Sequence, residues 1–253
     1  PTEIRLTRSQ FLGLLTALLA SGVPDVSGAQ GQRAKATRKF AAKGKDIAVE
    51  KPSTEGEKTS QLESVNWQGN GFYTQATETQ GIIIKAPQTI DPKALERAKE
   101  IIDRMLGRAQ PEVVERMVGE DAQLAIIPRG AFITALPEFS HLRRKRDPNG
   151  NPYDSFAVRG TGAIRGKPVT ATSEENLLKL RGDPFAAEDI TVHEVAHAVH
   201  NLGLTEEERR GWERLYRKYR GNFQTVFAGT NKDEFFAELT PSCFECNNEI
   251  GGE

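Results

Sequence analysis

Apolar residues recur at helical spacing in several parts of this chain. In residues 91–107 they stand three or four positions apart, which predicts an amphipathic helix with one face in a core. Residues 111–118 predict a second helix, because proline is favoured at the first helical position. Residues 205–220 predict a charged helix that opens with a capping box formed by Thr205 and Glu208.

Shorter apolar runs predict strands between these helices. Residues 71–85 form a β-rich stretch, and further strands are expected at 123–128, 156–159 and 169–172. The 253 residues allow one domain of fair size with extensions. We expect this domain to span residues 67–253.

The first 66 residues have a different pattern. In residues 1–29, two arginines precede the apolar run 11–20, and small residues follow at 27–29, as in a signal peptide. A short buried helix is the alternative. Residues 30–66 are polar and carry one aromatic residue, so we interpret them as a flexible linker or pro-segment. The expected location is therefore secreted or otherwise extracytoplasmic.

Composition narrows the classes of partner. The 253 residues carry a formal net charge of −1, which gives no general attraction to nucleic acid. The run 11–20 is too short to span a membrane, so no stable insertion is expected once a leader is removed. Cys243 and Cys246 form a lone C-x-x-C, compatible with a disulfide or with buried thiols. Nothing in the sequence indicates an oligomeric state.

Residues 193–200 carry the main chemical signal. They contain H-E-x-x-H, with His193 and His197 four positions apart and Glu194 between them. On a helix these histidines share one face and can hold one zinc ion, while the glutamate can reach a water molecule at the metal. Apolar residues fill the remaining positions, so the helix is expected to be buried, where unpaired polar groups are costly. We therefore predict a catalytic zinc site with Glu194 as general base.

The third metal ligand is not a later histidine of the metzincin pattern H-E-x-x-H-x-x-G-x-x-H. That pattern requires glycine at position 200 and histidine at 203, whereas this chain has His200 and Gly203. His200 lies about one turn beyond His197, and we expect it to flank the site or to make a core hydrogen bond.

A further helix, expected at residues 231–239, offers carboxylates as candidates for the third ligand. Asn231 is a plausible N-cap, and Glu234 and Glu238 lie four residues apart on one face. Glu234 as third ligand gives a His-His-Glu site, with Glu238 accepting a hydrogen bond from a ligand imidazole. The alternatives are the exchanged roles for the two glutamates, or a solvated acidic face.

These two segments resemble the catalytic domain of anthrax lethal factor and its relatives, which are zinc peptidases of the gluzincin type. The resemblance rests on residues 189–197 and 230–238, and loosely on 159–162 and 173–178. It implies a zincin-type α+β domain, in which a small mixed sheet is combined with an active-site helix and a second ligand-bearing helix. It also implies that His193, His197 and Glu234 bind Zn²⁺ and that Glu194 is the general base. The family has a tyrosine seven residues before the ligand glutamate, where this chain has Phe227.

The expected function is hydrolysis of peptide bonds in a peptide or protein substrate by a zinc endopeptidase. Glu238, Asp189 and Glu175 are candidates for holding the second nitrogen of a ligand histidine. The substrate is expected to pair with an edge strand, for which the strands at 123–128, 156–159 and 169–172 are candidates. Two alternatives remain, namely a zinc-containing binding or toxin-like module with little turnover, favoured by Phe227, and a zinc hydrolase of non-peptide amides.

Overall fold

The computed structural model describes residues 71–222 and 227–245. The leader expected at 1–29, the linker expected at 30–66, the expected domain start at 67 and Cys246 lie outside these residues. Within the described part of the chain, no helix has both the length and the apolar character needed to cross a membrane.

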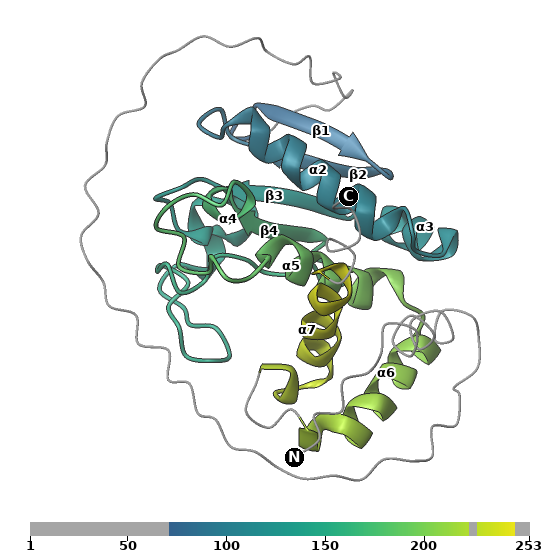
Figure 1. The fold of residues 1–253 in the computed structure, drawn as a ribbon. Helices are drawn as coiled ribbons and strands as arrows, with labels where there is room; N and C mark the ends of the chain where they lie inside the picture. Colours follow the sequence, from purple (N-terminus) through teal and green to yellow (C-terminus); the bar gives the residue numbers. More distant parts are fainter. Residues whose placement is uncertain (1–70, 223–226, 246–253) are drawn as a thin grey trace, which may run out of the picture.

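The four strands form one mixed sheet, which lies in the upper part of the molecule as drawn in Figure 1. Its order is β1-β2-β3-β4, with β1 antiparallel to β2 and the other neighbours parallel. Gln80 and Gly81 join β1 to β2 with positive φ angles of 52° and 74°, as a tight hairpin turn requires. The strands are β1 (Gln75–Thr79), β2 (Ile82–Ala86), β3 (Gln123–Ile127) and β4 (Val169–Ser173).

Both faces of the sheet are covered. Because successive side chains on a strand point to opposite faces, Leu124 and Ile126 of β3 join the core under the helices, while Ala125 and Ile127 join a smaller core on the other face. The smaller core lies under the 3-10 turns η1 (Ile133–Ala135) and η2 (Pro137–Leu142). Beside this core, Nζ of the buried Lys85 lies 2.7 Å from Oε1 of Glu138, which is partly exposed.

The helices confirm most of the predicted elements. The helices expected at 91–107, 111–118 and 205–220 appear with ends within one or two residues of those bounds, and Thr205 and Glu208 form the capping box. The helix expected at 231–239 continues to Glu245. The helices are α2 (Pro92–Leu106), α3 (Pro111–Gly119), α4 (Glu174–Leu177), α5 (Ile190–Ala198), α6 (Glu206–Tyr219) and α7 (Lys232–Glu245), with a π-helical turn η3 (Val199–Gly203) after α5.

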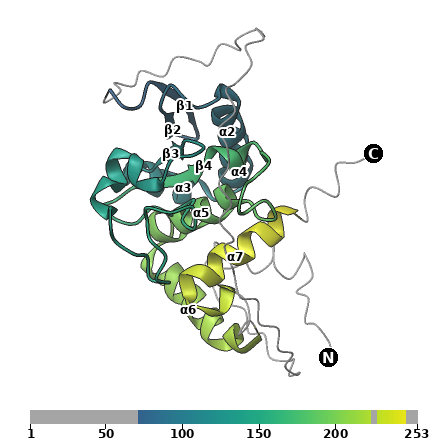
Figure 2. The same cartoon turned by 90° about the vertical axis from the view of Figure 1, so that its left-hand side faces the viewer.

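Helices α5 and α7 lie side by side below the sheet in both views, with α6 further from it (Figures 1 and 2). The chain therefore has the expected α+β architecture, in which a small mixed sheet accompanies the helix that carries H-E-x-x-H and a second helix that carries Glu234.

The strand expected at 156–159 is wrong. The Ser155 hydroxyl donates to the carbonyl of Pro152 and accepts from the amide of Ala157, so these residues turn instead of extending. Pairing begins only at Thr161, which bridges Ala171 on the outer side of β4. Of the three candidate edge strands, β3 is internal and β4 is the last of the four.

Candidate metal centre

The start of α5 is fixed by side chains from the sheet side of the fold. The Asp189 carboxylate caps the helix by accepting from the Val192 amide at 3.2 Å, and the amide of Ile190 donates to Asn176 Oδ1 at 2.9 Å. At the next residue, the hydroxyls of Thr172 on β4 and Thr191 on α5 are 2.7 Å apart and fully buried. These polar contacts set the position of the helix against the sheet.

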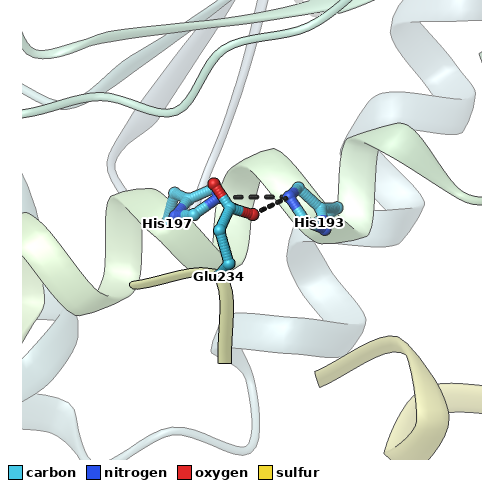
Figure 3. Close-up of side chains that lie close together, drawn as sticks. All are labelled: His193, His197 and Glu234. Atoms are coloured by element: carbon cyan, nitrogen blue, oxygen red, sulfur yellow. Dashed lines mark hydrogen bonds and ion pairs between the residues drawn. The ribbon is translucent and has the colours of Figure 1, made fainter. Parts of the chain in front are cut away.

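From this helix, His193 and His197 present their Nε2 atoms 3.1 Å apart. Glu234 enters from α7, and its Oε2 atom lies 3.3 Å from Nε2 of His193 and 3.4 Å from Nε2 of His197. Figure 3 shows the carboxylate between the two imidazoles. The three donor atoms therefore form a nearly equilateral triangle.

Glu234 is presented by the N-terminus of α7. The side-chain oxygen of Asn231 accepts from the amides of Asp233 and Glu234, both at 2.9 Å, which is the N-cap expected from the sequence. Phe235, Phe236 and Ala237 are buried in the main core, so the opposite side of the helix is held by packing. The capped, packed first turn fixes the direction of the Glu234 side chain.

Of the three other carboxylates expected to hold a ligand imidazole, one contacts a histidine of the group and two do not. Glu238 lies one turn beyond Glu234, and its Oε1 atom is 3.1 Å from Nδ1 of His193, where a carboxylate can hold the second ring nitrogen. Asp189 serves as the N-cap described above. Glu175 does not approach an imidazole, because both of its oxygens accept from the buried guanidinium of Arg159, at 2.6 and 2.9 Å.

His200 is fully buried on the π-helical turn after α5. Its Nδ1 atom lies 3.1 Å from Oδ1 of Asp233, the residue before Glu234. It does not join the group of His193, His197 and Glu234 that could hold a metal ion among the described residues.

Mutual contacts shift the charges of this group. Burial lowers the pKa of His193, but its contacts with Glu234 and Glu238 outweigh burial and raise that pKa to about 10. Burial raises the pKa of Glu234, but the two imidazoles outweigh it and lower that pKa to about 2. Glu234 is therefore a carboxylate at neutral pH, as a metal ligand must be.

Glu194 is contacted by a segment of the chain other than α7. It keeps some exposed surface, yet protein atoms crowd its carboxylate, and burial raises its pKa despite the opposing effect of His193 and His197. The backbone amide of Gly162 lies close enough to oppose this rise in the pKa of Glu194. Gly162 belongs to the segment of residues 160–164 that runs along the outer side of β4, which we call the edge segment.

Two glycines let the edge segment approach α5. A Cβ on Gly160 would lie 2.8 Å from Oε1 of Glu194, and one on Gly162 would overlap the Cβ of His197. In the sequence, these glycines fall within residues 159–162, where the resemblance to the lethal factor group is loose. Their role depends on a close contact between segments that are about 35 residues apart, which the G-x-G spacing alone does not predict.

Phe227 lies beside the group. Its ring centroid is 6.4 Å from that of His193, and 44% of its surface is exposed. The chain therefore places an apolar ring, without a hydroxyl, where the resemblance leads one to expect tyrosine.

The donor set fits a zinc ion. Bonds of about 2.0–2.1 Å in tetrahedral geometry separate two ligand atoms by roughly 3.3 Å. The observed separations are 3.1, 3.3 and 3.4 Å. Glu234 Oε2 is buried, and neither imidazole is aligned with it as a hydrogen-bond donor, so this oxygen has no hydrogen-bond partner. A cation between the three atoms would satisfy all of them.

Comparisons with known proteins add little. No protein-family profile matches the sequence, and no curated protein matches it. Among solved structures, the chain is similar to the Pro-Pro endopeptidase PPEP-2 from Paenibacillus alvei, with a TM-score of 0.42 and 16% sequence identity. The match covers 66% of this chain and 96% of that one. So distant a likeness does not identify the site, which rests on its own geometry.

Proposed function

We propose that this protein is a zinc-dependent endopeptidase related to the lethal factor group. The observation that carries the proposal is the triangle formed by His193 Nε2, His197 Nε2 and Glu234 Oε2, whose sides match the ligand spacing of a tetrahedral zinc ion. Zinc held there would polarise a peptide carbonyl and lower the pKa of water, which are the two requirements for hydrolysis near neutral pH.

The residues around this triangle have distinct roles in the proposal. Glu194 takes a proton from the attacking water and delivers it to the leaving amine, and the burial that raises its pKa brings it closer to the working pH of a general base. Glu238 holds Nδ1 of His193 and so keeps Nε2 turned toward Glu234. The substrate is a peptide or protein segment that pairs with the backbone of the edge segment.

The test measures bound zinc and cleavage of a peptide library for the wild type and for Glu194→Gln. We expect one zinc per chain in both proteins and cleavage only by the wild type. Bound zinc without cleavage that depends on Glu194 would refute the peptidase proposal, and a chain without stoichiometric zinc would refute the site.

A matched pair of substitutions on α7 tests the ligand assignment. Glu234→Ala is expected to weaken zinc binding far more than Glu238→Ala, since Glu234 faces both imidazoles and Glu238 faces the outer nitrogen of one. The opposite order would mean that the ligand and its supporting carboxylate are exchanged.

A second candidate function is a zinc-containing binding or toxin-like module with little turnover, and Phe227 is the observation that favours it. A hydroxyl that stabilises a developing oxyanion is often worth about 10²–10³ in rate. If the chain is a slow enzyme for this reason, Phe227→Tyr should raise kcat at least tenfold with little change in KM. No gain in the tyrosine variant of an active enzyme would show that another group supplies this contact.

The proposed location outside the cytoplasm rests on the leader-like pattern of residues 1–29 alone. Expression in a bacterial host followed by fractionation and mass spectrometry of the mature N-terminus tests it. Export with cleavage near residue 29 would support the proposal, whereas an uncleaved chain retained in the cytoplasm would refute it.

A further inference from the structure

Helix α5 and the π-helical turn that follows it contact α7 through three successive groups of histidine and carboxylate side chains. Positions 193, 197 and 200 share one helical face, because they are spaced by four and three residues. That face meets α7, where His193 contacts Glu238, both His193 and His197 contact Glu234, and His200 contacts Asp233. The group with the candidate metal ligands therefore lies between the His193–Glu238 contact and the His200–Asp233 contact.

The contact between His200 and Asp233 has no role in the proposed reaction. His200 is completely buried, and its ring lies 5.2 Å from that of Phe236. Neither ring nitrogen makes an aligned hydrogen bond, although Asp233 Oδ1 approaches Nδ1 to 3.1 Å. Packing alone would be served better by an apolar residue, since a buried imidazole must give up its hydration.

The position of Asp233 indicates a structural role for its contact with His200. Asp233 directly precedes Glu234 in the first turn of α7, and both amides are held by the same Asn231 cap. His200 lies on the π-helical turn that continues α5, a type of turn found frequently at functional sites. A contact between these two residues ties the turn that presents Glu234 to the segment that follows His197.

We propose that His200 and Asp233 are a positioning pair that sets the register of α7 along α5 and so holds Glu234 at ligand distance from the two histidines. This inference rests on the proposed zinc site. Among the described residues, no hydrogen bond or ion pair joins the side chains of this pair to a candidate metal ligand, so the pair acts by placing the backbone that carries Glu234.

The test measures the zinc dissociation constant by competition with a chromophoric chelator. Asp233→Ala and His200→Phe are each expected to weaken zinc binding by about ten- to hundredfold, the usual range for residues that support metal ligands. The double variant should bind no more weakly than the weaker single variant, because each change already breaks the same contact. Asp233→Asn keeps an oxygen at the same place and should restore binding to within about threefold of the wild type.

Two further readouts separate positioning from general stability. The visible spectrum of the cobalt(II)-loaded protein should change in Asp233→Ala and return in Asp233→Asn, because the spectrum reports the arrangement of the ligands. The thermal midpoint of the zinc-free protein serves as the stability measurement. Lys232→Ala alters the same helical turn, leaves both members of the pair in place, and should bind zinc as the wild type does.

Several outcomes would overturn the inference. One is a zinc dissociation constant within twofold of the wild type in both single variants; another is a double variant whose loss is the product of the two single losses. If His200→Phe fails to fold, Asp233→Ala decides alone, because its side chain is 42% exposed. A wild-type chain that binds no zinc would remove the proposed function itself, and the pair with it.

Discussion

Replacing Gly162 by alanine tests how closely the edge segment packs against α5. A Cβ at this position would overlap the Cβ of His197, far inside the 3.0 Å that real Cβ contacts respect, and would lie 3.1 Å from the carbonyl oxygen of Glu194. Neither atom is the end of a flexible side chain, so the clash cannot be relieved by a change of rotamer. Either α5 or the edge segment must move.

The size of the effect follows from this rigidity. Overpacking a core costs about 1–3 kcal/mol, and a clash with atoms fixed to the backbone places Gly162→Ala near ~3 kcal/mol of unfolding free energy. Metal bonds tolerate changes of about 0.2 Å, so a shift of His197 on the order of 1 Å should also weaken zinc binding at least tenfold.

The assay is urea unfolding of the zinc-free protein followed by circular dichroism, with the zinc dissociation constant measured separately. Gly119→Ala is the matched control, because a Cβ there meets nothing within 4 Å at the end of α3. It should leave stability unchanged or raise it by up to ~1 kcal/mol. A Gly162→Ala protein within ~0.5 kcal/mol of the wild type, with unchanged zinc affinity, would refute the close packing of the edge segment on α5.

Three further substitutions probe other contacts. A Cβ at Gly160 would lie 2.6 Å from Cγ2 of Ile190 and 2.8 Å from Cγ and Oε1 of Glu194, so both side chains must shift. Gly160→Ala should therefore lower kcat at least tenfold and leave zinc affinity within threefold, and unchanged turnover would contradict this. Arg159→Met leaves the buried Glu175 carboxylate unpaired and should cost about 3–5 kcal/mol in urea unfolding, while a loss under 1 kcal/mol would contradict that burial. Glu138→Gln should cost about 1.5–3 kcal/mol at pH 7, because hydrogen bonds from Lys85 and Tyr73 outweigh burial and lower the pKa of Glu138. Because the folded-state pKa of Glu138 is lowered, its ionised form stabilises the fold above the unfolded value of 4.5, and this stabilisation is lost as pH falls through the folded-state pKa. The difference in thermal midpoint between Glu138→Gln and the wild type should therefore narrow in acid. A difference that widens in acid would contradict this.

Local signals in the sequence were sufficient to predict the elements that carry the candidate ligands. The spacing of His193 and His197 depends on one helical turn, and the Asn231 cap depends on amides two and three residues away. The contact between Glu238 and His193 also follows from helix periodicity once Glu234 is placed. Each of these inferences needs only the geometry of a single helix and the requirement that two helices meet.

Contacts between distant segments could not be predicted in the same way. Glu175 was a reasonable partner for an imidazole by residue type, but Arg159 lies on a different segment and offers a bidentate match that an imidazole cannot. The turn at Ser155 depends on side-chain hydrogen bonds that compete with strand pairing. Similarly, the π-helical turn at Val199–Gly203 breaks the α-helical pattern without a proline to mark it.

The arrangement around α5 separates the candidate metal ligands from the proposed general base. The face with His193, His197 and His200 meets α7, whereas Glu194 is contacted by the edge segment through Gly160 and Gly162. Changes on α7 should therefore affect zinc affinity, and changes at Gly160 should affect turnover without loss of the metal. Because the two supports are different segments of the chain, the proposed enzyme could keep its zinc while losing hydrolysis. That property makes Phe227, which lies beside the metal group and contributes no ligand, the residue whose substitution best distinguishes an active peptidase from a zinc-containing binding module.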